Sequence, residues 1–239
     1  MSGHSKWATT HRQKEVADAK RGAIFTKLGN IITIAARQGG DPNANPSLRA
    51  AIDRAKAASM PKDNIERAIK KGTGELVGEQ VEELFYEGVL PGGVQVVVRC
   101  LTDNKNRSGS TVRHSFTKNG GSFSAVMWNF SQFGVIRVAS SEISDKSLSN
   151  ESLELELIDQ GIVDFVKEPE GITVYTEVKD LQKIHDFLEA KGLTLEASGL
   201  EYVAKDKIKL AADSGDKMDK FFEELEDNED VSEYYTNLA

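Results

Sequence analysis

The sequence has little cysteine and no long apolar run, and each shortage excludes a class of protein. Cys100 is the only cysteine among 239 residues, so an internal disulfide framework and a multi-cysteine zinc site are both excluded. Cys100 lies in the apolar run 94–101, and we interpret it as a small buried side chain rather than a reactive thiol. No apolar stretch approaches the roughly 20 residues that cross a bilayer, and the N-terminus lacks the apolar core of a signal peptide. These absences predict a cytoplasmic protein without a membrane partner.

A catalytic constellation is missing as well. The four histidines are His4, His11, His114 and His185, and no metal-ligand spacing links them. His114 and His185 fall on expected amphipathic helices, where a packed or surface histidine is the simpler interpretation. The glycine pairs of the chain match no phosphate-binding loop pattern. We therefore predict a protein that is not an enzyme and that uses no cofactor and no metal.

Charge is present in abundance but is unevenly distributed. Residues 1–75 contain 14 lysines and arginines against 7 aspartates and glutamates, a net charge of +7. Residues 76–239 contain 16 against 31, a net charge of −15. The sequence pI of about 5.2 averages these two regions. A basic N-terminal region on an acidic chain predicts a polyanionic partner for that region.

The candidate contacts for nucleic acid lie in the first 37 residues. Lysine and arginine bind phosphates of any sequence, Trp7 can stack on a base, and the two arm histidines fit phosphate or base contacts. No helix-turn-helix, zinc-finger or RNP pattern is present, so sequence-specific readout is not predicted. The candidate residues are His4, Lys6, Trp7, His11, Arg12, Lys14, Lys20, Arg21, Lys27 and Arg37.

Two other interpretations stay open at this point. The basic arm can be no more than a solvated tail. Alternatively, the chain is a protein-interaction adaptor that uses its acidic α/β domains, and its basic charge is incidental. Binding to nucleic acid that weakens as salt rises would distinguish the first hypothesis from both.

The N-terminal region predicts three helices behind a polar arm, residues 1–18. Apolar residues at helical spacing predict a helix over 19–37. A second helix begins after Asn45, a favourable N-cap, with Pro46 at its first position. Pro61 starts a third helix, and Gly72 is expected to stop it.

The pattern then changes to strands with interspersed helices. Strands are expected at 81–89 and 94–101, and a helix at 108–118. Residues 132–200 show the order βαββαβ, the ferredoxin-like split pattern, with Leu153, Leu157 and Ile158 on the inner face of one helix. A strand at 202–210, a helix at 217–226 and a strand at 231–235 would complete the preceding α/β domain. The prediction is an α+β protein: a helical domain, 1–75, and two small ferredoxin-like α/β domains, with 132–200 inserted into 76–131 and 201–239.

Several long motifs resemble the YebC family. They include Gly3-His4-Ser5-Lys6-Trp7, the segment from Met60 to Gly74, and Asp103-Asn104-Lys105-Asn106-Arg107. The resemblance covers essentially the whole chain and implies three domains, the third inserted in the second. It also implies a regulator of gene expression: family members are described as probable transcriptional regulators that bind DNA, or as translation factors that act on the ribosome. DNA or ribosomal RNA is then the expected partner, with the ribosome as a further one, for a protein that we expect to be a monomer.

Overall fold

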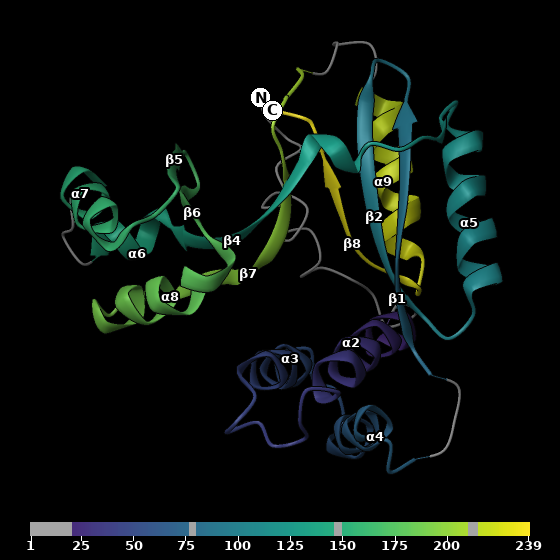
Figure 1. Cartoon of the computed structure of the whole chain (residues 1–239), viewed down its shortest axis with the longest axis horizontal. Helices are drawn as coiled ribbons and strands as arrows, with labels where there is room; N and C mark the ends of the chain where they lie inside the picture. The colour runs from purple at the N-terminus through teal and green to yellow at the C-terminus, as the bar shows by residue number, and fades with distance from the viewer. Residues whose placement is uncertain (1–20, 77–79, 146–149, 210–214) are drawn as a thin grey trace. The chain divides into compact units, whose positions relative to one another are not determined.

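A computed structural model describes residues 21–76, 80–145, 150–209 and 215–239 (Figure 1). The predicted arm, 1–18, lies outside the described residues. The chain divides into two compact units, one made of Met1–Trp128 with Asp206–Ala239, the other of Asn129–Lys205. Among the described residues, no helix has both the length and the apolar character needed to cross a membrane.

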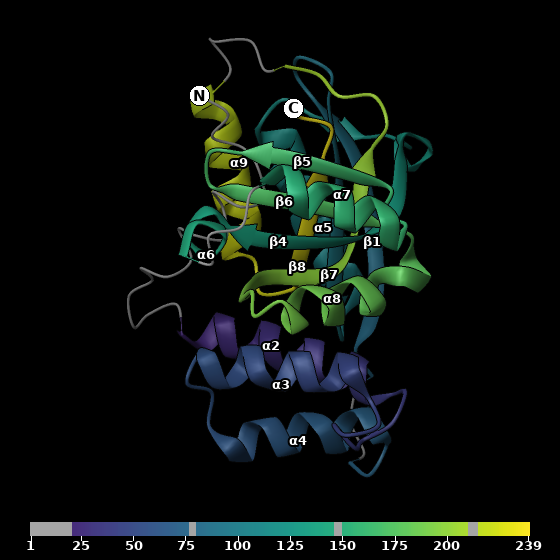
Figure 2. The same ribbon diagram turned by 90° about the vertical axis from the view of Figure 1, so that its left-hand side faces the viewer.

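Three helices form the helical part of the first unit, residues 21–76, namely α2 (Arg21–Ala36), α3 (Pro46–Ala57) and α4 (Lys62–Thr73) (Figure 2). The start of α3 follows the prediction: the Asn45 side chain accepts a hydrogen bond from the Leu48 N–H at 3.1 Å, and Pro46 occupies the first turn. The helices share an apolar core of their own, which is centred on Ile32, Leu48 and Ala55. The three helices of this part are therefore held together by packing of their own.

The helices α2 and α4 run in the same direction and pack very closely. Thr33 Oγ1 donates to the Ala68 carbonyl at 3.2 Å, and a Cβ on Gly72 would lie 2.3 Å from the Thr33 carbonyl oxygen. Gly72 is therefore a contact residue. The prediction that it stops the helix is wrong: α4 continues to Thr73, and Gly74 supplies the left-handed cap at φ 81°.

A four-stranded antiparallel sheet, in the order β3-β1-β2-β8, completes the first unit. Valines of β2 alternate onto a face that is covered by α5 and α9, where Phe116 and Phe221 meet edge to face with centroids 4.9 Å apart. The elements are β1 (Glu82–Leu90), β2 (Val94–Thr102), α5 (Lys105–Lys118), β3 (Ser122–Phe123), α9 (Gly215–Asp227) and β8 (Val231–Thr236).

The second unit carries an antiparallel sheet in the order β5-β6-β4-β7, whose strands lie side by side in Figure 2. Its apolar core lies between this sheet and the helices, and it includes Ile136, Leu157 and Ile184. The elements are β4 (Phe130–Ala139), α6 (Ser140–Asp145), α7 (Asn150–Gln160), β5 (Asp164–Glu168), β6 (Gly171–Thr176), α8 (Leu181–Ala190) and β7 (Leu195–Ala204), with short 3-10 turns η3 (Met127–Asn129) and η4 (Val178–Asp180).

The α+β class and the insertion of one sheet unit into the other are confirmed. The second unit has the βαββαβ order, whereas the first sheet is built as β1-β2-α5-β3-α9-β8. The inserted unit begins three residues before and ends five residues after the predicted range 132–200, because β4 and β7 pair along their length, from Phe130↔Ala204 onward. Treating 1–75 as a separate domain stays a prediction, since its described residues, 21–75, share a compact unit with the first sheet.

Two local predictions are wrong. The strand expected at 202–210 does not form as a separate element: residues 202–204 are the end of β7, and of the described residues 205–209 only Ile208 makes a bridge, an isolated one to Leu238. Ile158 of α7 does not face the core. Leu153 and Leu157, four residues apart, take the inner positions, and Ile158 lies about 100° further round the helix with 55% of its surface exposed.

Candidate nucleic-acid interface

The structure describes only part of the predicted site. His4, Lys6, Trp7, His11, Arg12, Lys14 and Lys20 lie outside the described residues, so their role stays a prediction. Arg21 is the first residue of α2. Lys27 and Arg37 are the predicted contacts whose side chains are described.

Lys27 and Arg37 bind main-chain carbonyl groups of the same unit. The Lys27 ammonium donates to the Glu226 carbonyl at the end of α9 at 2.5 Å, and the Arg37 guanidinium donates to the Val81 carbonyl just before β1. Between them on α2, Asn30 Nδ2 donates to the Leu101 carbonyl of β2 at 2.9 Å. Side chains of α2 thus hold the helical part against the first sheet, and these two cations have a structural contact that the sequence did not reveal.

A second group of cations lies on the last two turns of α4. Arg67, Lys70 and Lys71 occupy positions i, i+3 and i+4, which lie together on one side of a helix. Ile65 and Ala68 face the core, so Arg67 and Lys70 project into solvent, whereas Lys71 is half-buried. Lys70 and Lys71 also complement the negative end of the helix dipole.

Of the other cations of the helical part, Arg54 on α3 is exposed and has no ion pair among the described residues, whereas three are engaged. Arg49 donates to the carbonyls of Pro42 and Asn43 at 3.1 and 3.3 Å. Lys56 pairs with Asp53, and Lys62 pairs with Glu66, both at 3.4 Å on the surface. In the part of the chain that the structure describes, Arg67, Lys70 and Lys71 have no carboxylate within ion-pair distance. These three residues are not among the contacts predicted from the sequence, although the helical period of α4 places them opposite its apolar side.

Arginines of strands β2 and β4 and of helix α5 contact acidic or aromatic side chains. Arg99 bonds to Glu83 and Glu233 at 2.5 and 3.2 Å, and Arg137 makes a two-pronged pair with Glu201 at 2.7 and 2.9 Å. Arg113 lies over the Phe123 ring at 4.4 Å. Because carboxylates neutralise Arg99 and Arg137, these two guanidinium groups stabilise the sheets and offer little free charge to a phosphate.

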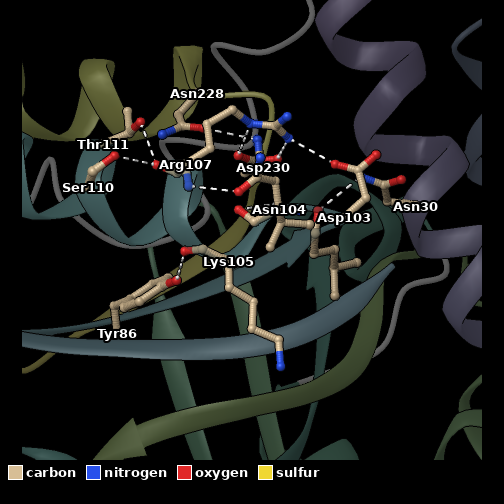
Figure 3. Close-up of polar contacts among 12 residues, drawn as sticks. Asn30, Tyr86, Asp103, Asn104, Lys105, Arg107, Ser110, Thr111, Asn228 and Asp230 are labelled. Atoms are coloured by element: carbon tan, nitrogen blue, oxygen red, sulfur yellow. Dashed lines mark hydrogen bonds and ion pairs between the residues drawn. The ribbon is translucent and has the colours of Figure 1, made fainter. Parts of the chain in front are cut away.

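A polar cluster surrounds Arg107 at the start of α5 (Figure 3). The Asn104 side chain caps the helix by accepting from the Arg107 N–H at 3.0 Å. The Arg107 guanidinium donates twice to the buried Asp230 carboxylate, at 3.0 and 2.7 Å, and once to Asp103 at 3.1 Å. Asp230 also accepts the Leu101 N–H through its main-chain carbonyl, at 2.8 Å. Motif residues 103–107 therefore fix the junction of β2, α5 and β8.

The Cys100 thiol and the His185 imidazole bear on the prediction that the protein is not an enzyme. Burial raises the pKa of the Cys100 thiol to about 11, so the thiol stays protonated at neutral pH. On α8, His185 Nδ1 lies 3.5 Å from Asp186 and 3.7 Å from Glu189. Both carboxylates are largely exposed on a single helix, an arrangement that is common without a metal.

Together the fold and the charges define an α+β protein of three parts, with a basic helical part and acidic sheets. The family model described as “TACO1/YebC protein N-terminal domain” matches residues 5–75. The model described as “TACO1/YebC second and third domain” matches residues 81–238. The chain belongs to the TACO1/YebC family, as its motifs indicated.

Similar proteins and one solved structure support this family assignment. A probable transcriptional regulatory protein of Geobacter sulfurreducens is 46% identical over 242 residues, covering 100% of this chain and 96% of that protein. A protein of the same description from Thermoanaerobacter pseudethanolicus is 43% identical over 100% of this chain and 97% of its own length. The crystal structure of a conserved hypothetical protein from Aquifex aeolicus matches with a TM-score of 0.81 at 40% identity, over 93% of this chain and 91% of that one.

Proposed function

We propose that this protein is a non-enzymatic regulator of gene expression that binds nucleic acid through its basic N-terminal region. The observation that carries the proposal is the group Arg67, Lys70 and Lys71. It presents positive charge, without a carboxylate partner in the described residues, on a helical part of net charge +5 over residues 21–76. Such charge binds phosphates regardless of base sequence.

The relatives support the regulatory part of this proposal. Proteins more than 40% identical over the whole chain are described as probable transcriptional regulatory proteins. For this chain we extend that description to a cytoplasmic protein whose partner is DNA or ribosomal RNA, with the ribosome as the site of action in the second case. The arm residues Lys6, Arg12, Lys14 and Lys20 would add phosphate contacts to those of α4.

The test compares two triple variants of the full chain. In Arg67→Gln/Lys70→Gln/Lys71→Gln, the affinity for nucleic acid should fall, and the slope of log affinity against log salt should decrease in magnitude by about one per lost phosphate contact. Lys179→Gln/Lys207→Gln/Lys209→Gln removes the same charge from exposed positions in the sheet units and is the matched control. Binding is measured on duplex DNA and on structured RNA over a salt series.

Two outcomes would contradict the proposal. If both triple variants lost affinity equally, the binding would reflect net charge alone and the α4 group would have no special role. If the wild-type protein bound neither nucleic acid at low salt, the adaptor hypothesis would take its place.

Substitution of Trp7 tests whether the ligand is DNA or RNA. Stacking of an indole on an unpaired base contributes about 1–3 kcal/mol, and duplex bases are already stacked. Trp7→Ala should therefore weaken binding to looped RNA more than binding to duplex DNA, with an unchanged salt slope because no counterion is released. Equal losses on both ligands would remove the preference for RNA.

A further inference from the structure

Exposed apolar side chains are concentrated in the second unit. Among the described residues, seven large apolar side chains are exposed, and five of them belong to residues 129–205. Two lie on α7: Leu155, with 66% of its surface exposed, and Ile158, with 55%. The others in this unit are Val163, Val178 and Leu200.

The two residues of α7 are neighbours on its solvent side. Leu155 and Ile158 are three positions apart, a spacing that places side chains next to each other on a helix. The opposite side of α7 belongs to the core of the second unit, because Leu153 and Leu157 are buried against the sheet with Ile172 and Ile184. Thus α7 is apolar on two sides, and only one of them is explained by the core of its own unit.

The surroundings of this apolar pair are acidic. The sequence of α7 is NESLELELIDQ, with four carboxylates and no basic residue. Residues 129–205 hold 15 aspartates and glutamates against 7 lysines and arginines, so this unit alone has a net charge of −8. Glu154 and Glu156 are each paired with one lysine, Lys167 and Lys191. Asp159, one residue after Ile158, is exposed and has no ion-pair partner among the described side chains.

We propose that the solvent side of α7, which we call the α7 surface and define by Leu155, Ile158 and Asp159, docks a cationic amphipathic segment of a partner protein. Apolar side chains of such a segment would cover Leu155 and Ile158, and its lysines or arginines would face Asp159 and the acidic unit around it. Nucleic acid does not fit this surface, because phosphates would meet a net negative charge. A second copy does not fit it face to face either, because the same acidic surface would oppose itself.

The proposal is independent of nucleic-acid binding by the helical part, so its test uses another probe. A fluorescein-labelled helical peptide of leucine and lysine, with leucines at i, i+3, i+4 and i+7, is titrated with the full-length protein and followed by anisotropy. Leu155→Ser/Ile158→Ser should weaken binding about tenfold or more. Both side chains are mainly in solvent, so circular dichroism should show an unchanged fold. Val178→Ser/Leu200→Ser removes two exposed apolar side chains of the same unit and should leave the affinity unchanged.

Charge and apolar contact are separated by a second peptide in which serine replaces every leucine. This peptide should bind wild-type protein at least tenfold more weakly than the leucine peptide. Equal affinity of the two peptides, or equal weakening by both serine double variants, would overturn the proposal. Sedimentation of the wild-type protein at low salt provides a further check. Self-association that is lost in Leu155→Ser/Ile158→Ser would make the occupant the basic region of a second copy and would also overturn it.

Discussion

The helical part and the second unit bear opposite charges, and their exposed helix surfaces differ in kind. Residues 21–76 have ten lysines and arginines against five carboxylates, whereas residues 129–205 have seven against fifteen. The last turns of α4 present the exposed Arg67 and Lys70 beside the half-buried Lys71, but the exposed side of α7 presents Leu155 and Ile158 among carboxylates. Under the two proposals, the helical part would bind a polyanion and the α7 surface would bind a basic segment of a partner protein.

The same comparison shows that an arginine count does not locate a binding surface. Strands β2 and β4 hold Arg99 and Arg137, α5 holds Arg107 and Arg113, and each of the four is engaged by a carboxylate or a ring. Arg67 lacks such a partner among the described residues. What distinguishes the two regions is the share of cationic charge that internal partners leave available.

The largest expected effect separates structural from binding arginines. Arg107→Ala leaves the carboxylate of Asp230, only 4% exposed, without its cation, and should lower the free energy of unfolding by about 2–3 kcal/mol. Nucleic-acid affinity should stay unchanged. Arg67→Ala is the counterpart, with a loss of affinity and a change in stability within about 0.5 kcal/mol. Urea denaturation measures the stability of both variants, and binding titrations measure their affinity for nucleic acid. The distinction between structural and binding arginines is contradicted if Arg107→Ala weakens binding as much as Arg67→Ala does.

Packing of the helical part is tested by Gly72→Ala. The new methyl group would meet the Thr33 carbonyl, so the helices must separate, and we expect a loss of about 1–3 kcal/mol. Gly29→Ala is the control, because its Cβ would meet only the flexible end of Met60 at 3.7 Å. Alanine there should stabilise α2 by roughly 0.5–1 kcal/mol. Thermal unfolding measures both, and equal effects would show that helix propensity alone is responsible.

A smaller effect should show whether Arg37 serves the fold or the ligand. If its bond to the Val81 carbonyl is its role, Arg37→Ala should cost about 1 kcal/mol of stability and leave the salt slope of binding unaltered. Arg37→Lys keeps the charge but not the guanidinium geometry and should recover part of the stability. A reduced salt slope in Arg37→Ala would return this residue to the nucleic-acid interface.

The smallest effect concerns the core of the first sheet. With a thiol pKa of about 11, only about one Cys100 side chain in a thousand is ionised at pH 8. Labelling by iodoacetamide should be much slower than in Cys100→Ser/Ser124→Cys, which moves the thiol to an exposed position. Fast labelling of the folded wild-type protein would show that this core opens readily. Because the folded state keeps this thiol protonated, its contribution to stability is lost as pH rises from about 9 toward 11.

Elements with strong local signals were predictable from the sequence. Asn45-Pro46 marked the start of α3, and the apolar run 94–101 marked a central strand, because a cap and a buried strand each depend on nearby residues. The start of α5 was placed at 108 instead of Lys105, since the capping role of Asn104 was not recognised. The close approach at Gly72 and the exposure of Ile158 depend on which neighbouring element arrives, which no local pattern contains.

From the sequence, the candidate site was predictable only as a region of net positive charge. The sequence showed that residues 1–75 are basic, but a lysine that binds a phosphate and a lysine that binds the carbonyl of Glu226 look alike in a sequence. Tertiary contacts alone separate Lys27 and Arg37 from Arg67, Lys70 and Lys71. The cations of α4 could have been found by extending its helical period from Ile65 and Ala68 to the opposite side.

The neighbouring ends of the inserted unit influence the order in which the chain can fold. The first sheet is incomplete until β8 arrives, and Val96 of β2 pairs with Thr236, 140 positions later. Because the Lys205 N–H binds the Asn129 carbonyl at 2.8 Å, a folded second unit joins its own ends and removes 77 residues from that loop. Shortening the loop between β2 and β8 in this way changes its closure entropy little, because halving a loop lowers that cost by only about 0.6 kcal/mol. During synthesis, the inserted unit can therefore fold before the first sheet receives β8, which follows it in the chain.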